Sequence, residues 1–237
     1  LTEALHPKGS GEEDKHIVIG AYGSGAKPKF SAKNIGIPWT FTDGSTRYAS
    51  DALYLENQEY IEIRDLEISN KPEGYTGQES STQAAMRKDR RGIHIVGGNN
   101  TTQTELNGFW LHDLYIHDVV GEANGVSGTG WDPSKRTAGI LFEIIVKGSN
   151  GLPVVANPVD VTGYQPTWFA DVTIEQNVLI DNSFGGIIVK QLEAWGARQD
   201  TGSAPSYDYA GWYPNKRFTI QDNYLDHDGS EYAADTI

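Results

Sequence analysis

Hydrophobic and polar residues alternate along this chain in short segments, and one arrangement of two such segments recurs. Each copy has an alternating stretch, a short polar corner and a second alternating stretch. The copies cover residues 16–23, 60–70, 108–118, 171–182 and 217–228, the first being the weakest. Alternation with a period of two residues indicates half-buried β-strands, so each copy predicts two short strands joined by a bend.

A third predicted strand lies between these copies, and most of its examples begin with Gly-Ile. It is ALYLE at residues 52–56, GIHIV at 92–96, GILFE at 139–143 and GIIVK at 186–190. The hydrophobic residue at its second position recurs after 40, 47 and 47 residues, from Leu53 to Ile187. A unit of three strands that repeats in the same order predicts a parallel β-helix.

Two other fold classes fit the pattern less well. No segment between the strands has the 3.6-residue period of a helix, which argues against a doubly wound sheet. An immunoglobulin-like sandwich would not repeat the same three strands in order. Asn177 and Asn223 occupy the same corner of successive units, where stacked Asn side chains can hydrogen-bond along a solenoid. We therefore expect an all-β chain with a single domain over residues 1–237.

The two ends of the chain do not resemble the caps that a solenoid needs. The last residues, Thr236 and Ile237, begin another copy of the third strand. We expect a domain cut at both ends, or one that lies beside another chain or fragment that completes the solenoid.

Long segments flank the Gly-Ile strand on both sides. They cover residues 71–90, 119–137, 145–170 and 191–216, whereas the corner between the other two strands keeps two or three residues. Walls on both sides of one sheet predict a groove over it, and loops of this length are usually functional. The alternative is that a solenoid tolerates insertions anywhere on its surface, which does not explain why one corner never grows.

Alternation along the Gly-Ile strand predicts which residues form the floor of this groove. One outward row contains Tyr54, His94, Leu141 and Ile188, and the next contains Glu56, Val96, Glu143 and Lys190. Paired strands lie about 4.8 Å apart, so Glu143 and Lys190 are expected to be neighbours. One interpretation is a solvated ion pair worth a few tenths of a kcal/mol. The functional interpretation makes Glu143 an acid or base and Lys190 a ligand for a sugar hydroxyl or carboxylate.

The densest cluster of carboxylates lies near the end of the chain. Asp228 and Asp235 flank a short loop and are placed to reach the groove floor beside Lys190. Cleavage of a glycosidic bond needs one protonated carboxyl as acid and one ionised carboxylate as nucleophile or base. A calcium site or a solvated polar turn is the alternative interpretation of these acids.

Aromatic residues lie in or beside the long flanking segments. The tryptophans among them are Trp131, Trp168, Trp195 and Trp212. Packing against the solenoid is the simpler explanation for any one of them, but four beside one groove favour stacking on sugar rings.

Composition excludes several other functions. The chain of 237 residues has 19 Lys and Arg against 32 Asp and Glu, and the net charge of −13 is unfavourable for binding nucleic acid. The absence of Cys excludes a disulfide scaffold, a cysteine zinc site and a thiol nucleophile. No window is long and apolar enough for a membrane span. His112 and His117 are five residues apart on alternating strands, which argues against a shared metal.

Several segments resemble secreted bacterial carbohydrate enzymes of the pectate-lyase-like superfamily. HIVIGAYGSGAKPK at 16–29 resembles their opening coil, YIEIRDLEISN at 60–70 resembles the next coil, and LYIHDV at 114–119 with KRTAGILF at 135–142 resembles a further pair of motifs. The resemblance implies a right-handed parallel β-helix of about five coils, in an extracellular, cell-surface or periplasmic protein. Asp228 and Asp235 have the seven-residue spacing of the catalytic pair in β-helix lacto-N-biosidases, whereas the polygalacturonase pattern is missing.

Three functions follow from these observations. The first is a glycoside hydrolase acting on an oligo- or polysaccharide through Asp228 and Asp235, with Glu143 as a substitute and without a metal or cofactor. Its expected substrate contacts are Lys190, His94, Trp131, Trp195, Trp212 and Arg136. The second is a polysaccharide lyase, which needs a base such as Lys190 and either calcium or Arg91, Arg136 or Arg198 to neutralise a uronate. The third is a non-catalytic carbohydrate-binding solenoid. The acidic balance disfavours a polyanionic substrate.

Overall fold

The computed structural model describes residues 3–33, 37–40, 46–74, 89–98, 105–121, 136–145, 167–191 and 214–226, with the backbone alone for 37–40, 46–48 and 191. These residues form strands and turns without a helix, and the strands lie in three sheets of five. The first sheet contains β3 (Ile37–Thr40), β4 (Thr46–Glu56), β7 (Asp89–Gly97), β10 (Ala138–Ile144) and β13 (Gly185–Gln191).

The other two sheets contain shorter strands. The second sheet consists of β1 (Ile17–Gly20), β5 (Ile61–Arg64), β8 (Glu105–His112), β11 (Trp168–Glu175) and β14 (Lys216–Gln221). The third consists of β2 (Lys29–Ser31), β6 (Glu67–Asn70), β9 (Tyr115–Val119), β12 (Val178–Ile180) and β15 (Tyr224–Asp226). From β4 onward the chain visits the first, second and third sheets in turn.

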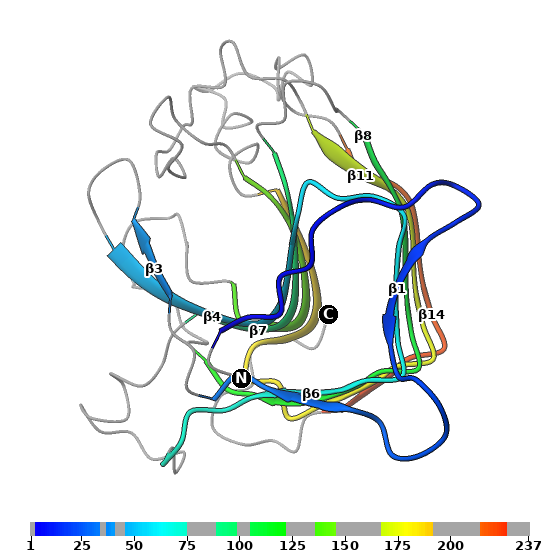
Figure 1. Ribbon diagram of the computed structural model, residues 1–237. Helices are drawn as coiled ribbons and strands as arrows, with labels where there is room; N and C mark the ends of the chain where they lie inside the picture. The colour runs from blue at the N-terminus through cyan, green and yellow to red at the C-terminus, as the bar shows by residue number, and fades with distance from the viewer. Residues whose placement is uncertain are drawn as a thin grey trace.

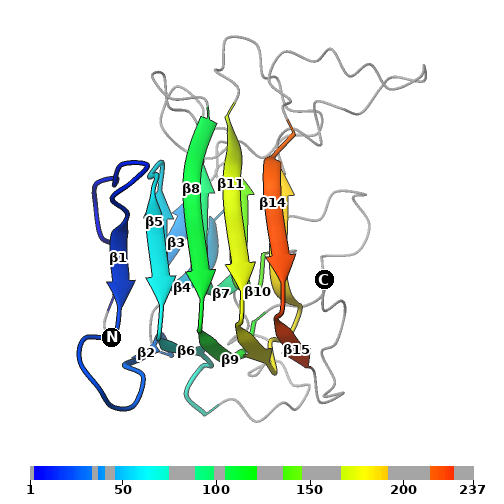
Figure 2. The same ribbon diagram turned by 90° about the vertical axis from the view of Figure 1, so that its right-hand side faces the viewer.

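The three sheets surround one core, as the view along the stack shows (Figure 1). Neighbouring strands pair in parallel except β3 and β4, which form an antiparallel pair at one edge of the first sheet. The strands of the second sheet stand side by side in chain order (Figure 2). This arrangement is a parallel β-helix, which confirms the predicted three-strand repeat.

Hydrophobic residues from equivalent positions of successive coils form the core. Leu53, Ile93, Ile140 and Ile187 are register partners in the first sheet, as the sequence predicted. Phe142 packs edge to face against three aromatic rings, those of Phe109, Phe169 and Phe218. Burial of these rows is the main source of stability in a solenoid, where each coil contacts only the neighbouring coils.

The glycine of the Gly-Ile motif is required by close packing within the strand. A Cβ atom on Gly92 would lie 2.6 Å from the carbonyl oxygen of Gly139 and 2.9 Å from a methyl group of Ile116. A Cβ atom on Gly139 would lie 2.8 Å from the carbonyl oxygen of Gly186. The motif therefore marks a place inside the strands of the first sheet where the next coil leaves no room for a Cβ atom.

From β5 onward the corners between the second and third sheets have two residues each, within the predicted range, whereas the corner between β1 and β2 is longer and covers residues 21–28. The first residue of each two-residue corner is in the left-handed region, with φ of 54° at Asp65, 52° at Asp113, 56° at Gln176 and 53° at Asp222. Asp is among the non-glycine residues that tolerate this conformation best. In the last two corners the second residue is Asn177 or Asn223, and the predicted ladder forms, because Asn177 Nδ2 donates to Asn223 Oδ1 at 2.9 Å.

The strands of the first sheet begin earlier than the Gly-Ile motif predicts. Strand β7 begins at Asp89, inside the segment 71–90 that the sequence had assigned to a wall of the groove. Arg90 and Arg91 are therefore strand residues, and both are buried. Arg91, one of the cations that the sequence offered to a lyase for neutralising a uronate, is therefore a buried strand residue.

Candidate functional site

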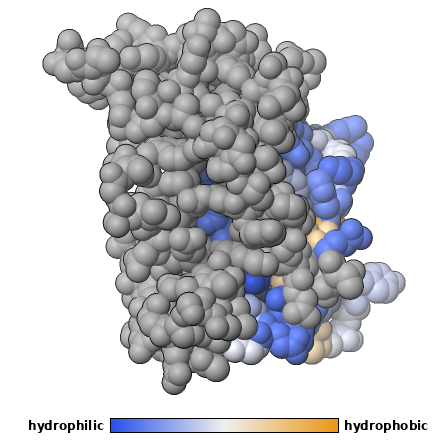
Figure 3. Space-filling view, turned by 90° about the vertical axis from the view of Figure 1, so that its left-hand side faces the viewer, coloured by the Kyte–Doolittle hydropathy of each residue, from blue (hydrophilic) through white to orange (hydrophobic). Residues whose placement is uncertain are grey.

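The outer face of the first sheet contains the predicted floor residues of the groove. Glu143 on β10 and Lys190 on β13 are register partners, which confirms that they are neighbours. His94 on β7 pairs in register with Tyr54 on one side and Leu141 on the other. On this side of the molecule, the described residues that are visible lie mainly along one edge and are mostly hydrophilic (Figure 3).

Asp51 and Arg91 form a buried ion pair at the base of this face. The guanidinium donates from Nε to Oδ1 at 2.6 Å and from Nη2 to Oδ2 at 3.1 Å, so that both carboxylate oxygens are engaged. The two residues are register partners on β4 and β7, one position before Ala52 and Gly92. Bidentate pairing of this kind holds both side chains in one geometry.

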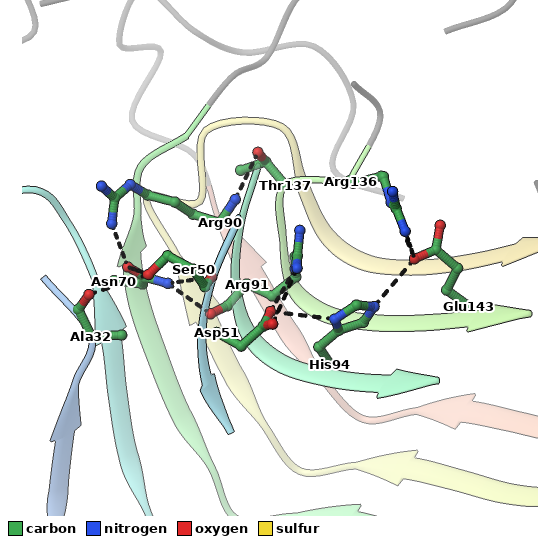
Figure 4. A network of polar contacts seen from close by, with 10 residues as sticks. All are labelled: Ala32, Ser50, Asp51, Asn70, Arg90, Arg91, His94, Arg136, Thr137 and Glu143. Atoms are coloured by element: carbon green, nitrogen blue, oxygen red, sulfur yellow. Dashed lines mark hydrogen bonds and ion pairs between the residues drawn. The ribbon is translucent and has the colours of Figure 1, made fainter. Parts of the chain in front are cut away.

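His94 lies between Asp51 and Glu143 (Figure 4). Its Nδ1 is 3.3 Å from Asp51 Oδ1, and its Nε2 is 3.2 Å from Glu143 Oε2. The imidazole is completely buried and makes an edge contact with the ring of Tyr54, with ring centroids 5.4 Å apart. The ring is thus held from three sides.

Arg136 is the second partner of Glu143. It precedes β10 and donates to Glu143 Oε2 from Nε at 3.1 Å and from Nη2 at 2.6 Å. Oε2 therefore accepts three hydrogen bonds, whereas the buried Oε1 has no hydrogen-bond partner within the described part of the protein. An unsatisfied buried acceptor costs about 1–3 kcal/mol, and more when the group is charged.

Asp51 and Glu143 are ionised at neutral pH. Burial alone would raise the pKa of Glu143, but the charges of Arg136 and Lys190 and the hydrogen bond from His94 outweigh it and hold the pKa well below its usual range. Burial likewise opposes ionisation of Asp51, and Arg91 and His94 outweigh it, so that the pKa of Asp51 is also lowered. Because an ionised carboxylate can only accept, His94 Nε2 carries the hydrogen of its bond to Glu143.

A second set of hydrogen bonds fixes the backbone beneath this network. Asn70 Nδ2 donates to the carbonyl oxygens of Ser50, at 2.8 Å, and Arg91, at 2.9 Å. Arg90 donates from Nη1 to Asn70 Oδ1 at 2.8 Å, and its pKa is lowered by burial to about 10, so that it remains a cation (Figure 4). Asn70 thereby ties the third sheet to the strands that carry Asp51 and Arg91.

The structure brings together four of the predicted site residues. Glu143, His94 and Arg136 are in direct contact, and Lys190 is adjacent to Glu143 on the next strand. The remaining predicted site residues lie outside the described parts of the chain, and they are Asp228, Asp235, Trp131, Trp195 and Trp212. Trp168 belongs to β11 of the second sheet, where its Nε1 donates to Glu105.

Sequence reasoning missed Asp51, and it named Arg91 only as one of the cations that a lyase could use. Both directly precede the third strand of the repeat, and they occupy the same position in consecutive units with opposite charge. These opposite charges at equivalent positions could have predicted the ion pair. The prediction would have required the strand to start before the Gly-Ile motif, as it does in the structure.

His112 and His117 are separate from this site and from each other. His112 on the second sheet lies between Asp113 and Glu62, and His117 on the third sheet lies between Asp118 and Glu67. In the described segments, no group of three or more His, Asp or Glu side chains is arranged to hold a metal ion. These segments also contain no helix with the length and hydrophobicity needed to cross a bilayer.

Comparison with known proteins supports the fold. No protein-family model matches the sequence, and no curated protein matches it. Among solved structures, the chain is similar to a GH136 lacto-N-biosidase from Eubacterium ramulus, with a TM-score of 0.64 and 23% sequence identity. The alignment covers 94% of this chain and 33% of that enzyme, so the chain spans about a third of the enzyme's length. The protein thus shares its parallel β-helical fold with a glycoside hydrolase.

Proposed function

We propose that this chain is part of a carbohydrate-active enzyme that hydrolyses glycosidic bonds in a groove over the outer face of the first sheet. The observation that carries the proposal is the buried network of Asp51, Arg91, His94, Glu143 and Arg136 on that face. Two ionised carboxylates and two guanidinium groups buried on one sheet are costly, and they are more typical of a functional site than of a stability device. Similarity to the fold of a lacto-N-biosidase supports a sugar as the substrate.

The chemical steps in this proposal belong to Asp228 and Asp235. One of them protonates the leaving oxygen, and the other attacks the anomeric carbon or activates water. Glu143 is unsuited to the acid role because its lowered pKa leaves it without a proton at neutral pH. It is also a weak nucleophile, since Arg136 and His94 stabilise its negative charge.

The other expected residues bind the substrate. Lys190 lies next to Glu143 and supplies a donor, while Trp131, Trp195 and Trp212 are proposed to stack on sugar rings. We further propose that the solenoid is right-handed, that it continues in more coils or in another chain, and that the protein works outside the cytoplasm on an oligo- or polysaccharide.

A polysaccharide lyase is the main alternative, and the ion pairs weaken it. Two of the cations available to neutralise a uronate, Arg91 and Arg136, are already engaged by Asp51 and Glu143. A lyase would also need calcium or another cation near its base.

Product analysis separates these functions. The protein is incubated with neutral glycans, including a glycoside of lacto-N-biose, and with uronate polymers, with and without a chelator. New reducing ends without ultraviolet absorbance are expected, and Asp228→Asn and Asp235→Asn should abolish them. Glu175→Gln, the same kind of change on the second sheet, should leave turnover intact. Products with unsaturated ends that absorb in the ultraviolet would show that the protein is a lyase and not a hydrolase. Binding of a glycan without turnover would indicate a carbohydrate-binding solenoid.

A further inference from the structure

The two oxygens of Glu143 have very different surroundings. Oε2 accepts hydrogen bonds from Arg136 Nε, Arg136 Nη2 and His94 Nε2, at 3.1, 2.6 and 3.2 Å. Oε1 is buried and has no hydrogen-bond partner among the residues that the structure describes, and in Figure 4 it is the Glu143 oxygen without a dashed line. Buried polar groups without a partner are rare, and one at a candidate binding face indicates a missing ligand atom.

The carboxylate cannot turn to satisfy Oε1 without losing these bonds. Rotation about its terminal torsion would take Oε2 away from three donors on two different residues. His94 is itself held by Asp51, at 3.3 Å from Nδ1, and Asp51 is held in a bidentate pair by Arg91. Three neighbouring strands, β4, β7 and β10, thus hold Oε1 in one position, which is the preorganisation that a binding site requires.

The charge of this network determines what can bind to Oε1. Asp51 and Glu143 are ionised, and Arg91 and Arg136 balance them. An ionised oxygen accepts a hydrogen from a hydroxyl or amide group and repels a second carboxylate. The chemistry therefore favours a neutral sugar and disfavours a uronate at this point.

We propose that Glu143 Oε1 is the acceptor for a hydroxyl or N-acetyl amide hydrogen of a bound neutral sugar, held in place by His94 and Arg136. Asp51 and Arg91 act as positioning residues, because they reach the sugar only through His94. This inference rests on the proposed function, since it assigns the sugar class that the same site takes.

Binding is measured separately from turnover. The Asp228→Asn protein is crystallised with an oligosaccharide taken from the panel, and its affinity for that sugar and for single-deoxy and N-acetyl-deleted analogues is measured by calorimetry. We expect one sugar oxygen or nitrogen within hydrogen-bond distance of Glu143 Oε1, and one analogue that binds about 10- to 100-fold more weakly, as for a hydrogen bond to a charged group.

A variant cycle assigns that loss to Glu143. In the same background, Glu143→Gln should lower the affinity for the parent sugar, because the acceptor has become a neutral amide. The one sensitive analogue should then bind about as tightly as the parent sugar. Arg136→Gln combined with Glu143→Gln keeps the network free of an unpaired charge and should behave in the same way, in case the single variant is unstable. Glu175→Gln is the matched control and should retain the full penalty.

The possible results distinguish this inference from the proposed function. One result is that the protein turns over its substrate, but in the crystal Oε1 contacts water, a metal ion or another side chain and not the bound sugar. That result overturns the inference and keeps the hydrolase. Absence of turnover together with the expected coupling keeps the sugar site and overturns the hydrolase. The inference is wrong if no sugar binds. It is also wrong if every analogue that binds more weakly than the parent sugar still does so, by the same factor, in both Glu143 variants.

Discussion

Asn223 accepts two hydrogen bonds from Asn177, one from the backbone nitrogen at 3.1 Å and one from Nδ2 at 2.9 Å. Asn177 is almost fully buried, and it also donates to the carbonyl oxygen of Leu111 and accepts from the backbone nitrogen of Leu114, both at 3.0 Å. One amide thus satisfies groups in three successive coils at the corner between the second and third sheets.

Replacing this buried amide should destabilise the solenoid. In Asn177→Ala, the Leu114 nitrogen and the Leu111 carbonyl lose their partner, so the free energy of unfolding is expected to fall by about 2–4 kcal/mol. Urea denaturation followed by circular dichroism measures the change. Asn223→Ala is the comparison, and it should cost less because Asn223 is more exposed; an equal or larger loss there would contradict the ladder as described.

The stability of the protein should fall in acid because of Asp51 and Glu143. Both carboxyls have lowered pKa values in the folded protein and values near 4 in the unfolded chain. A carboxyl of this kind stabilises the fold above its unfolded pKa, and this contribution is lost as the pH falls from about 4 towards the folded pKa. Denaturation midpoints measured between pH 7 and pH 2 should therefore decrease steeply below about pH 4.

Asp51→Asn separates the contribution of this carboxyl from that of the other acids. The variant should be less stable by about 3–5 kcal/mol at pH 7, because Arg91 remains buried without its anion. Its stability should change less with pH in acid than that of the unchanged protein. If the plots of stability against pH are parallel for the two proteins, protonation of Asp51 does not contribute to the loss of stability in acid.

A glycine at one corner should stabilise the protein. Gln176 has φ of 56° and an exposed side chain, and a non-glycine residue in the left-handed region is strained by about 1 kcal/mol. Gln176→Gly relieves this strain, although it also makes the unfolded chain more flexible, so we expect a gain of about 0.5 kcal/mol. Thr173→Gly, in the middle of β11, is the matched control and should lower the melting temperature; a loss in both variants would contradict the argument.

The aromatic centre of the core should be sensitive to a loss of volume. Phe142→Ala removes edge-to-face contacts with Phe109, Phe169 and Phe218 and leaves a cavity, with an expected loss of about 3–5 kcal/mol. Phe142→Leu retains most of the buried volume and should cost much less. Equal losses in thermal or chemical unfolding would argue that volume is not the determining factor.

Repetition made much of the fold predictable from the sequence. A solenoid places the same step of each repeat in the same sheet, so the spacing from Ile93 to Ile140 to Ile187 is enough to predict their register. The same reasoning predicted that Glu143 and Lys190 are neighbours and that Asn177 stacks on Asn223. The antiparallel pairing of β3 with β4 interrupts the repeat, and no copy elsewhere in the chain signals it.

The candidate site was only partly predictable because its contacts depend on side-chain direction. The repeat places His94 and Glu143 on one face, but their hydrogen bond crosses between strands at register positions that are two residues apart. Arg136 reaches Glu143 from a segment that precedes β10, outside the alternating pattern. Periodicity contains no information about such a contact.

The sequence alone determined the class of fold, the order of the three strands and the rows that face the core, because these depend on local alternation and on a repeat length. Only the tertiary structure decided that Arg91 and Arg136 are buried partners of Asp51 and Glu143 instead of exposed cations. Whether a charged side chain is solvated or paired depends on what the fold places within a few ångströms of it, and that distance is not encoded in its neighbours along the chain.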